Sequence, residues 1–141
     1  MSIEEIIESW KRSRAISPCI TDLRTSKKRE GQYRPFPRFI HPVIRKALET
    51  EGIEQLYSHQ VDAIGAVHEG KDIVVVSPTA SGKTLCYNLP VLNTKLEAPS
   101  SKAFYLFPTK ALSQDQMFEL QNLIQRIEKS IATFTYDGDT P

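Results

Sequence analysis

The sequence has few of the features that mark exported or membrane proteins. Its 141 residues contain only two cysteines, Cys19 and Cys86, which are far apart and outside any Cys-x-x-Cys pattern. A disulfide framework or a zinc site is therefore not expected. No apolar run approaches the roughly 20 residues of a membrane helix, and the first residues are acidic where a signal peptide is basic. We expect an intracellular protein, cytoplasmic if bacterial, that does not bind membranes.

Charge of either sign is in little excess, but it is unevenly distributed. The net charge is +1, yet residues 1–38 hold nine Lys/Arg against five Asp/Glu, and residues 39–141 hold nine against twelve. A basic arm ahead of a mildly acidic body could contact nucleic acid. A solvated arm without a partner fits the charge equally well. We therefore expect two parts, an N-terminal helix with a basic arm (1–38) and a body (39–141).

The arm is expected to begin with a short amphipathic helix. Ser2 and Glu5 have the spacing of a capping box. The apolar residues that follow recur at helical spacing and form one stripe: Ile3, Ile6, Ile7 and Trp10. From residue 13 to residue 38 no period survives, and prolines with a basic run predict a loop or extended segment.

The body alternates between helical and strand-like patterns. Helices are expected from Pro42 to about Gly52 and over 58–70, then after the loop at 77–82 and from about Thr109 to 127. Continuous apolar runs predict buried strands at 73–76, 103–107 and 131–136. This order predicts an α/β fold with a parallel sheet of about three strands flanked by helices, and a ligand at the strand C-terminal ends. A doubly wound sheet usually has more strands, so we expect a piece of a longer protein or a shortened form of one.

The segment between the first predicted strand and the next helix has the layout of a phosphate-binding P-loop. It reads Ser-Pro-Thr-Ala-Ser-Gly-Lys-Thr over 77–84. Backbone amides of Thr79, Ala80, Ser81 and Gly82, with the helix N-terminus, would surround a triphosphate. Lys83 would reach the outer phosphates, and the Thr84 hydroxyl would coordinate Mg²⁺. Ser77 stands where the full pattern has glycine, so an ordinary turn after a buried strand is the alternative.

Four strings in a fixed order identify the sequence as similar to a known family. They are Tyr-Ser-His-Gln at 57–60, the P-loop at 77–84, Pro-Thr-Lys-Ala-Leu-Ser-Gln-Asp-Gln at 108–116 and Tyr-Asp-Gly-Asp-Thr-Pro at 136–141. Together they resemble the first RecA-like domain of superfamily 2 DEAD/DEAH-type, RecQ-like DNA helicases of the MrfA/YprA and fungal Hrq group. The resemblance covers about residues 39–141 and implies a partial RecA-like P-loop domain.

The resemblance implies an ATP site with Mg²⁺ as cofactor. Gln60 resembles the glutamine that reads the adenine edge, because a side-chain amide both donates and accepts hydrogen bonds. Tyr57 belongs to the same string, and Phe39 is the candidate aromatic for stacking on the base. Lys83 and Thr84 resemble the catalytic residues of the P-loop.

The resemblance also implies contact with a single nucleic-acid strand, expected to be DNA. The residues that match the strand-binding motifs are Pro108, Thr109, Lys110, Gln114, Gly138 and Thr140. The Thr109 hydroxyl, the helix N-terminal amides and Lys110 suit phosphate contacts. Helicases of this kind work with a second RecA-like domain, which is therefore an expected partner in the parent chain.

The sequence lacks the residues that would complete catalysis. No Asp-Glu-x-His tetrad follows the P-loop, and the family's arginine fingers come from the second RecA-like domain. We expect the isolated chain to bind nucleotide without hydrolysing it or unwinding DNA. Two alternatives remain open: another P-loop NTPase or kinase, although no basic lid or Asn-Lys-x-Asp is present, and a non-enzymatic nucleic-acid-binding adaptor with a degenerate P-loop.

Overall fold

The computed structural model describes residues 2–24, 30–77, 81–127, 129–138 and 140. Contacts divide the chain into two compact units, Met1–Glu30 and Gly31–Pro141. The division falls earlier than the boundary after Arg38 that composition suggested, because residues beyond Glu30 pack with the larger unit. No helix in the described part of the chain is long and apolar enough to cross a membrane.

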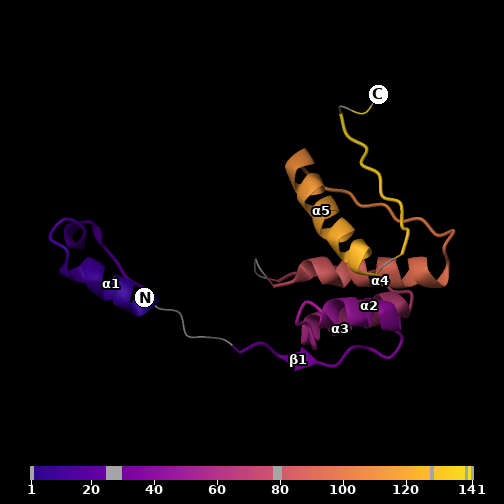
Figure 1. Ribbon diagram of the computed structural model, residues 1–141, viewed down its shortest axis with the longest axis horizontal. Helices are drawn as coiled ribbons and strands as arrows, with labels where there is room; N and C mark the ends of the chain where they lie inside the picture. Colours follow the sequence, from indigo (N-terminus) through magenta and orange to yellow (C-terminus); the bar gives the residue numbers. More distant parts are fainter. Residues whose placement is uncertain (1, 25–29, 78–80, 128, 139, 141) are drawn as a thin grey trace. The chain divides into compact units, whose positions relative to one another are not determined.

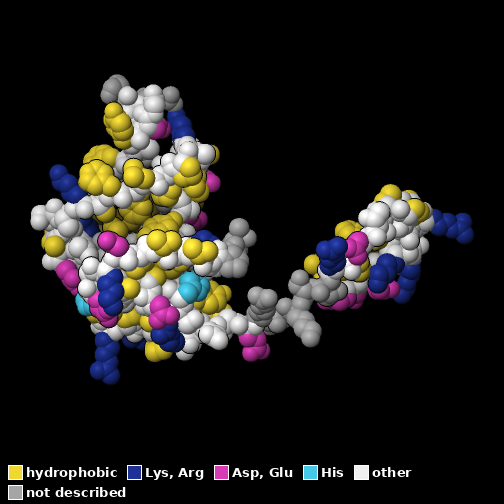
Figure 2. All heavy atoms as spheres, turned by 180° about the vertical axis from the view of Figure 1, so that it is seen from behind, with side chains coloured by type: hydrophobic (Ala, Val, Ile, Leu, Met, Phe, Trp, Pro, Cys, Tyr) yellow, Lys and Arg dark blue, Asp and Glu magenta, His cyan; other side chains and the backbone are white. Residues whose placement is uncertain are grey.

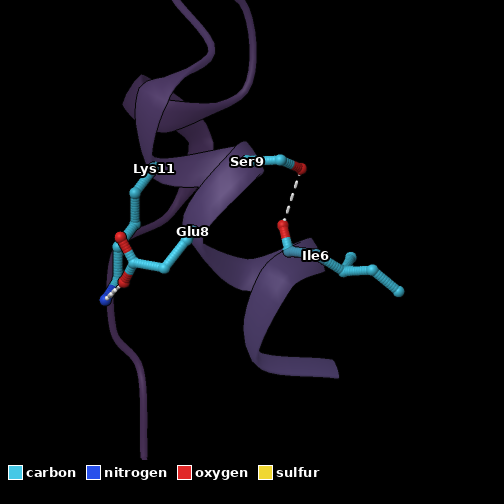
Figure 3. A network of polar contacts seen from close by, with 4 residues as sticks. All are labelled: Ile6, Glu8, Ser9 and Lys11. Carbon is cyan, nitrogen blue, oxygen red and sulfur yellow. Dashed lines mark hydrogen bonds and ion pairs between the residues drawn. The ribbon is translucent and has the colours of Figure 1, made fainter. Parts of the chain in front are cut away.

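The smaller unit is built around helix α1 (Ile3–Arg12), followed by a 3₁₀ turn, η1 (Ser17–Cys19). The predicted capping box is confirmed: Ser2 N donates to Glu5 Oε2 at 2.8 Å, and Glu5 N donates to Ser2 Oγ at 3.3 Å. Figure 3 shows two further local contacts on α1, from Ser9 Oγ to Ile6 O and from Lys11 Nζ to Glu8 Oε1, both 2.8 Å long. No residue of α1 is fully buried, although Ile6 and Ile7 are half-buried and the helix contacts η1.

The described residues of the larger unit include four helices: α2 (Pro42–Glu49), α3 (Ser58–His68), α4 (Lys83–Glu97) and α5 (Lys110–Ile127). All four were expected, and Pro42 occupies the first turn of α2 as predicted. Gly52 and Gly70, just beyond the ends of α2 and α3, have φ of 81° and 76°. Only glycine adopts this left-handed conformation at little cost, which explains why the helices stop there.

The helices enclose one apolar core. Helix α3 packs on α4 and α2 packs on α5, and α4 runs alongside α2 and α3 in Figure 1. The most deeply buried side chains come from all four helices and from the strand residue Leu56; they include Ile44, Leu48, Ile64, Leu89, Leu92 and Ile127. Asn93 is also buried, and its Oδ1 accepts a 2.7 Å hydrogen bond from His41 N, which anchors the start of α2 to α4. The core holds the N-terminal ends of α3 and α4 in a fixed relation.

The described residues contain one sheet, formed by two short strands, β1 (Tyr33–Arg34) and β2 (Leu56–Tyr57). They pair antiparallel, with Tyr33 opposite Tyr57 and Arg34 opposite Leu56. The sequence predicts a loop or extended segment up to residue 38, and the structure adds that residues 33 and 34 are a strand paired with β2. The pairing partner lies more than twenty residues away, where no local pattern reveals it.

The predicted parallel sheet of three strands is not confirmed. Segments 73–76, 103–107 and 131–136 have no regular secondary structure among the described residues. Exposed and half-buried side chains nevertheless alternate over residues 74–77, 104–107 and 131–134, which is the period of a strand. The most exposed large apolar side chains of these segments are 89% to 95% accessible: Val74, Val76, Phe104, Leu106, Phe134 and Tyr136. Figure 2 shows hydrophobic side chains gathered on the surface of the larger unit. A strand needs neighbours for its backbone hydrogen bonds, and within the described part of the chain no segment pairs with these three.

Candidate nucleotide-binding site

The P-loop connects segment 73–76 to the start of α4. Residues 78–80, which include the predicted site residues Thr79 and Ala80, lie outside the described part of the chain. Gly82 is the N-cap residue of α4 and has φ 72°. The helix begins at Lys83, so its first backbone amides have no carbonyl partner within the helix. These amides and the helix dipole make this end of α4 suited to an anion.

The side chain of Lys83 lies across the loop. Its Nζ donates to Ser77 O at 2.8 Å, to Ser77 Oγ at 3.1 Å and to Ser81 Oγ at 3.2 Å. The hydroxyls of Ser77 and Ser81 are themselves 2.6 Å apart. These three acceptors are uncharged oxygens. Phosphate oxygens are stronger acceptors and can replace them.

Gln60 joins the beginning of α3 to the P-loop. Its buried amide donates from Nε2 to Gly82 O at 2.8 Å, and its Oε1 accepts from Tyr57 N at 2.8 Å. The adjacent residue, His59, makes a second contact between α3 and the P-loop, with Nε2 3.0 Å from Ser81 O. A Cβ atom on residue 82 would lie 2.6 Å from Gln60 Nε2, so the close approach requires glycine. The Tyr-Ser-His-Gln string at 57–60 is therefore joined to the P-loop at 77–84 by hydrogen bonds.

An aromatic stack lies beside this junction. The rings of Tyr33 and Tyr57 are 4.7 Å apart and those of Tyr57 and His59 are 5.6 Å apart. A 3.3 Å hydrogen bond runs from Tyr33 Oη to Tyr57 Oη, and this bond raises the pKa of Tyr33 above its ordinary value. The sequence predicts Tyr57 as a residue of the nucleotide site, but it does not predict Tyr33 or His59 there. Gly31 permits the stack, because a Cβ there would lie 2.7 Å from the Tyr57 ring.

Phe39 is not part of this group. Its ring stacks on His68, with centroids 3.8 Å apart, and it packs against the core. His68 is the last residue of α3, whereas Gln60 is in its first turn. The rise of the helix separates these positions by about 12 Å. The structure brings Tyr57 and Gln60 to the P-loop and leaves Phe39 at the far end of α3.

Thr84 faces α5. Its Oγ1 donates a 3.4 Å hydrogen bond to Gln116 Oε1, which also accepts a 2.5 Å bond from Tyr87 Oη. No group of three His, Cys, Asp or Glu side chains in the described residues could hold a metal ion. A single hydroxyl fits Mg²⁺ all the same, because this ion commonly takes one or two protein oxygens and completes its shell with phosphates and water. Sequence reasoning missed Gln116, although it is the last residue of the third string.

The third and fourth strings also come together. Thr109 caps α5 as predicted: its Oγ1 accepts from Leu112 N at 3.2 Å. Lys110, the first residue of α5, places Nζ 3.5 Å from Asp137 Oδ2. Thr140 Oγ1 accepts from Asp137 N at 2.9 Å and thereby shapes the turn. The remaining predicted strand contacts are exposed: Pro108, Gln114 and Gly138.

Comparison with known proteins places these features in a family. The model of the DEAD/DEAH box helicases matches residues 57–141. The helicase YprA of Bacillus subtilis is 53% identical over 112 residues, which cover 79% of this chain and 15% of YprA. The ATP-dependent helicase HRQ1 of Saccharomyces cerevisiae is 34% identical over 141 residues, 99% of this chain and 13% of HRQ1.

Solved structures give the same result. A crystal structure of the DUF1998 helicase MrfA bound to DNA superposes with a TM-score of 0.83 at 45% identity, covering 100% of this chain and 20% of MrfA. A second MrfA structure, with DNA and AMPPNP, superposes with the same TM-score at 44% identity. The helicase fold is therefore shared with MrfA. The chain spans about a fifth or less of the length of these relatives.

Proposed function

Because this chain belongs to the DEAD/DEAH box helicase family, we propose that it is the nucleotide-binding and strand-contacting part of an ATP-dependent DNA helicase. It supplies the first part of the first RecA-like domain. The parent protein couples ATP hydrolysis to movement along DNA, together with a second RecA-like domain. The DNA in one MrfA structure and the DNA and AMPPNP in the other support this assignment of ligands.

The observation that carries the proposal is the junction between Gln60 and the P-loop. A glutamine tied to Gly82 O and to Tyr57 N brings the family's adenine-reading string against its phosphate-binding string. The amide keeps one N–H and one lone pair beyond these two bonds, which suit the donor and acceptor edge of adenine. Thr79, Ala80, Ser81 and Gly82 line the phosphate path, Lys83 binds the outer phosphates and Thr84 binds Mg²⁺. Phe39 takes part only if the base reaches the far end of α3.

The N-terminal end of α5 forms the strand-binding part. Thr109 and Lys110 face the same turn as Thr140, because Lys110 pairs with Asp137. Backbone phosphates would take the place of Asp137 at Lys110, with Pro108, Gln114 and Gly138 bordering the path. Contacts of this type position a strand without reading its sequence.

The exposed segments 73–76, 103–107 and 131–136 complete the fold in the parent protein. We infer that they become parallel strands when the remaining strands of the RecA-like domain pair with them. The alternation of exposed and half-buried side chains over residues 74–77, 104–107 and 131–134 and the high content of Val, Phe and Tyr support this inference.

Nucleotide titration tests the proposal. Labelled ATP should bind the chain more tightly than labelled GTP, and Lys83→Ala should weaken ATP binding by at least about tenfold, as expected for loss of a charge-assisted bond. Equal binding by Lys83→Ala would reject the P-loop and favour an adaptor. The isolated chain should hydrolyse no ATP. DNA-stimulated hydrolysis by these 141 residues would contradict the proposal that hydrolysis requires the rest of the parent protein.

A further inference from the structure

Gln116 stands between the nucleotide site and the strand site. It belongs to the second turn of α5, and the N-terminal end of that helix carries Thr109 and Lys110. Gln116 is six positions after Lys110 in the helix, a rise of about 9 Å. On its other side, Gln116 Oε1 accepts hydrogen bonds from two residues of α4, Thr84 and Tyr87. Among the described residues, Gln116 is the only side chain that hydrogen-bonds to Thr84 Oγ1.

The bond to Thr84 has a consequence for metal binding. A threonine hydroxyl that coordinates Mg²⁺ uses an oxygen lone pair, so its proton must point away from the ion towards an acceptor. Gln116 Oε1 already accepts from Thr84 Oγ1 at 3.4 Å and can serve as that acceptor. A cation makes the hydroxyl a better donor, and partners of this kind orient the metal's own ligands.

Tyr87 fixes the amide in that position. Its hydroxyl donates to the same Oε1 atom from the next turn of α4, and its ring meets the Tyr105 ring edge-on with centroids 5.9 Å apart. Tyr105 Oη in turn donates to the buried Asn88 at 3.0 Å. Gln116 is half-buried and therefore shielded from much of the competition with water.

We propose that Gln116 is a positioning residue that couples Mg²⁺–nucleotide binding at Thr84 to strand binding at the N-terminal end of α5. The inference rests on the proposed function. Nucleotide binding tightens the bond from Thr84 to Gln116, and the rigid helix carries the resulting constraint to Thr109 and Lys110. By linkage, a bound strand changes the affinity for nucleotide by the same factor.

The test measures that factor in the full-length protein that contains this segment. The affinity for a fluorescent single-stranded oligo(dT) is determined with and without Mg²⁺–AMPPNP, in the original protein and in Gln116→Met. Methionine keeps the length and helix propensity of glutamine but accepts no comparable hydrogen bond. Gln125→Met is the matched control, because Gln125 is on the same helix and exposed. Gln116→Glu keeps an acceptor oxygen.

In the original protein, Mg²⁺–AMPPNP should change the oligo(dT) affinity by about 5-fold to 150-fold, the usual range of coupling between sites. The factor should fall below about twofold in Gln116→Met and stay unchanged in Gln125→Met, with Gln116→Glu retaining most of it. Oligo(dT) affinity without nucleotide should be the same in all four proteins. A purely structural role for Gln116 would instead lower both affinities and leave their ratio unchanged.

Other outcomes overturn the inference in different ways. An undiminished factor in Gln116→Met rejects the role of Gln116 while the proposed function stands. Binding of both ligands by the original protein without any coupling has the same meaning. Failure of the original protein to bind AMPPNP rejects the proposed function and this inference with it. If Gln116→Met does not fold, Gln116→Ala replaces it, with Gln125→Ala as its control.

Discussion

Gln60 Nε2 donates a 2.8 Å hydrogen bond to Gly82 O and so fixes the start of α3 on the P-loop. In Gln60→Glu the side chain remains the same length, but a carboxylate has no donor for Gly82 O. The buried oxygens would face each other without a proton between them. We expect a loss of about 1–3 kcal/mol in the free energy of unfolding, the usual cost of an unsatisfied buried polar group.

Chemical denaturation of the chain measures this loss, and ATP titration should show weaker binding. Lowering the pH protonates the new carboxyl, restores a donor and should recover part of the loss. If Gln60→Glu is as stable as the original chain at neutral pH, the hydrogen bond from Gln60 to Gly82 does not stabilise the fold.

Glycine is required at position 82 but not at position 65. Alanine at 82 meets two penalties: a φ of 72°, which costs about 1–2 kcal/mol for a residue with a Cβ, and the contact at 2.6 Å with Gln60 Nε2. Gly65 lies inside α3 with nothing within 4 Å of its Cβ position. Gly65→Ala should therefore stabilise the chain by about 0.5–1 kcal/mol, since glycine is a poor helix former. Denaturation midpoints of the two variants should move in opposite directions.

Tyr105 should make the stability of the folded chain fall at alkaline pH. Burial, and then the nearby Tyr87, raise the pKa of Tyr105 to about 12. Below about pH 10 the phenol is neutral whether the chain is folded or unfolded. Between about pH 10 and 12 the unfolded chain releases this proton and the folded chain keeps it, so stability falls as the pH rises through this range. The contribution is fully present below about pH 10.

Tyr105→Phe removes this component. The variant also loses the hydrogen bond to Asn88, so it should be less stable than the original chain at pH 8. The difference between the two should shrink towards pH 12. Stability curves at several pH values check this, and the ultraviolet absorbance of tyrosinate shows directly whether one tyrosine ionises late. A constant difference at all pH values would mean that Tyr105 titrates normally.

Leu106 should behave differently in the isolated chain and in the full-length protein. It is 95% exposed here, so Leu106→Thr should change the stability of the 141-residue chain by no more than about 0.5 kcal/mol. We infer that segment 103–107 is a strand in the full-length protein. There the same substitution should lower the free energy of unfolding by about 1.5–3 kcal/mol, because a buried leucine side chain is lost. Threonine also has a high strand propensity, so a loss of stability in the full-length protein would not come from a lower strand propensity. An equal, small effect in both proteins would argue against the inferred sheet.

The two cysteines provide a rapid check of the fold. Cys19 is exposed, whereas Cys86 is buried in α4, and burial raises the pKa of its thiol. The thiolate is the reactive form, so a thiol reagent at neutral pH should modify one cysteine quickly and the second only after denaturant is added. Mass spectrometry identifies the modified residue. Cys19→Ser should abolish the fast phase.

The features that the sequence predicted well depend on a few neighbouring residues. The capping box of Ser2 and Glu5 involves groups three positions apart, and the Thr109 cap is equally local. The glycines that follow α2 and α3 act through their own φ angles. Such elements can be predicted from short windows because the partners lie inside the window.

The features that the sequence did not reveal depend on distant partners. Tyr33 pairs with Tyr57 in the sheet, and Gln116 meets Thr84 across two helices. Nothing beside Gln116 in the sequence distinguishes it from Gln114, which is exposed. The three apolar segments differ in another way. Their composition predicts strands, but among the described residues no neighbouring strand pairs with them. A strand is a property of at least two segments, and one segment cannot establish it.

The ion pair between Lys110 and Asp137 affects how strand binding should depend on salt. Each lysine that neutralises a phosphate normally releases small cations from the nucleic acid, which makes binding weaken steeply as salt is added. Here Lys110 must first give up Asp137, and the carboxylate left behind attracts a cation from solution. The uptake of that cation offsets part of the release. The protein should therefore hold its strand over a wider range of ionic strength than the number of its lysine–phosphate contacts would suggest.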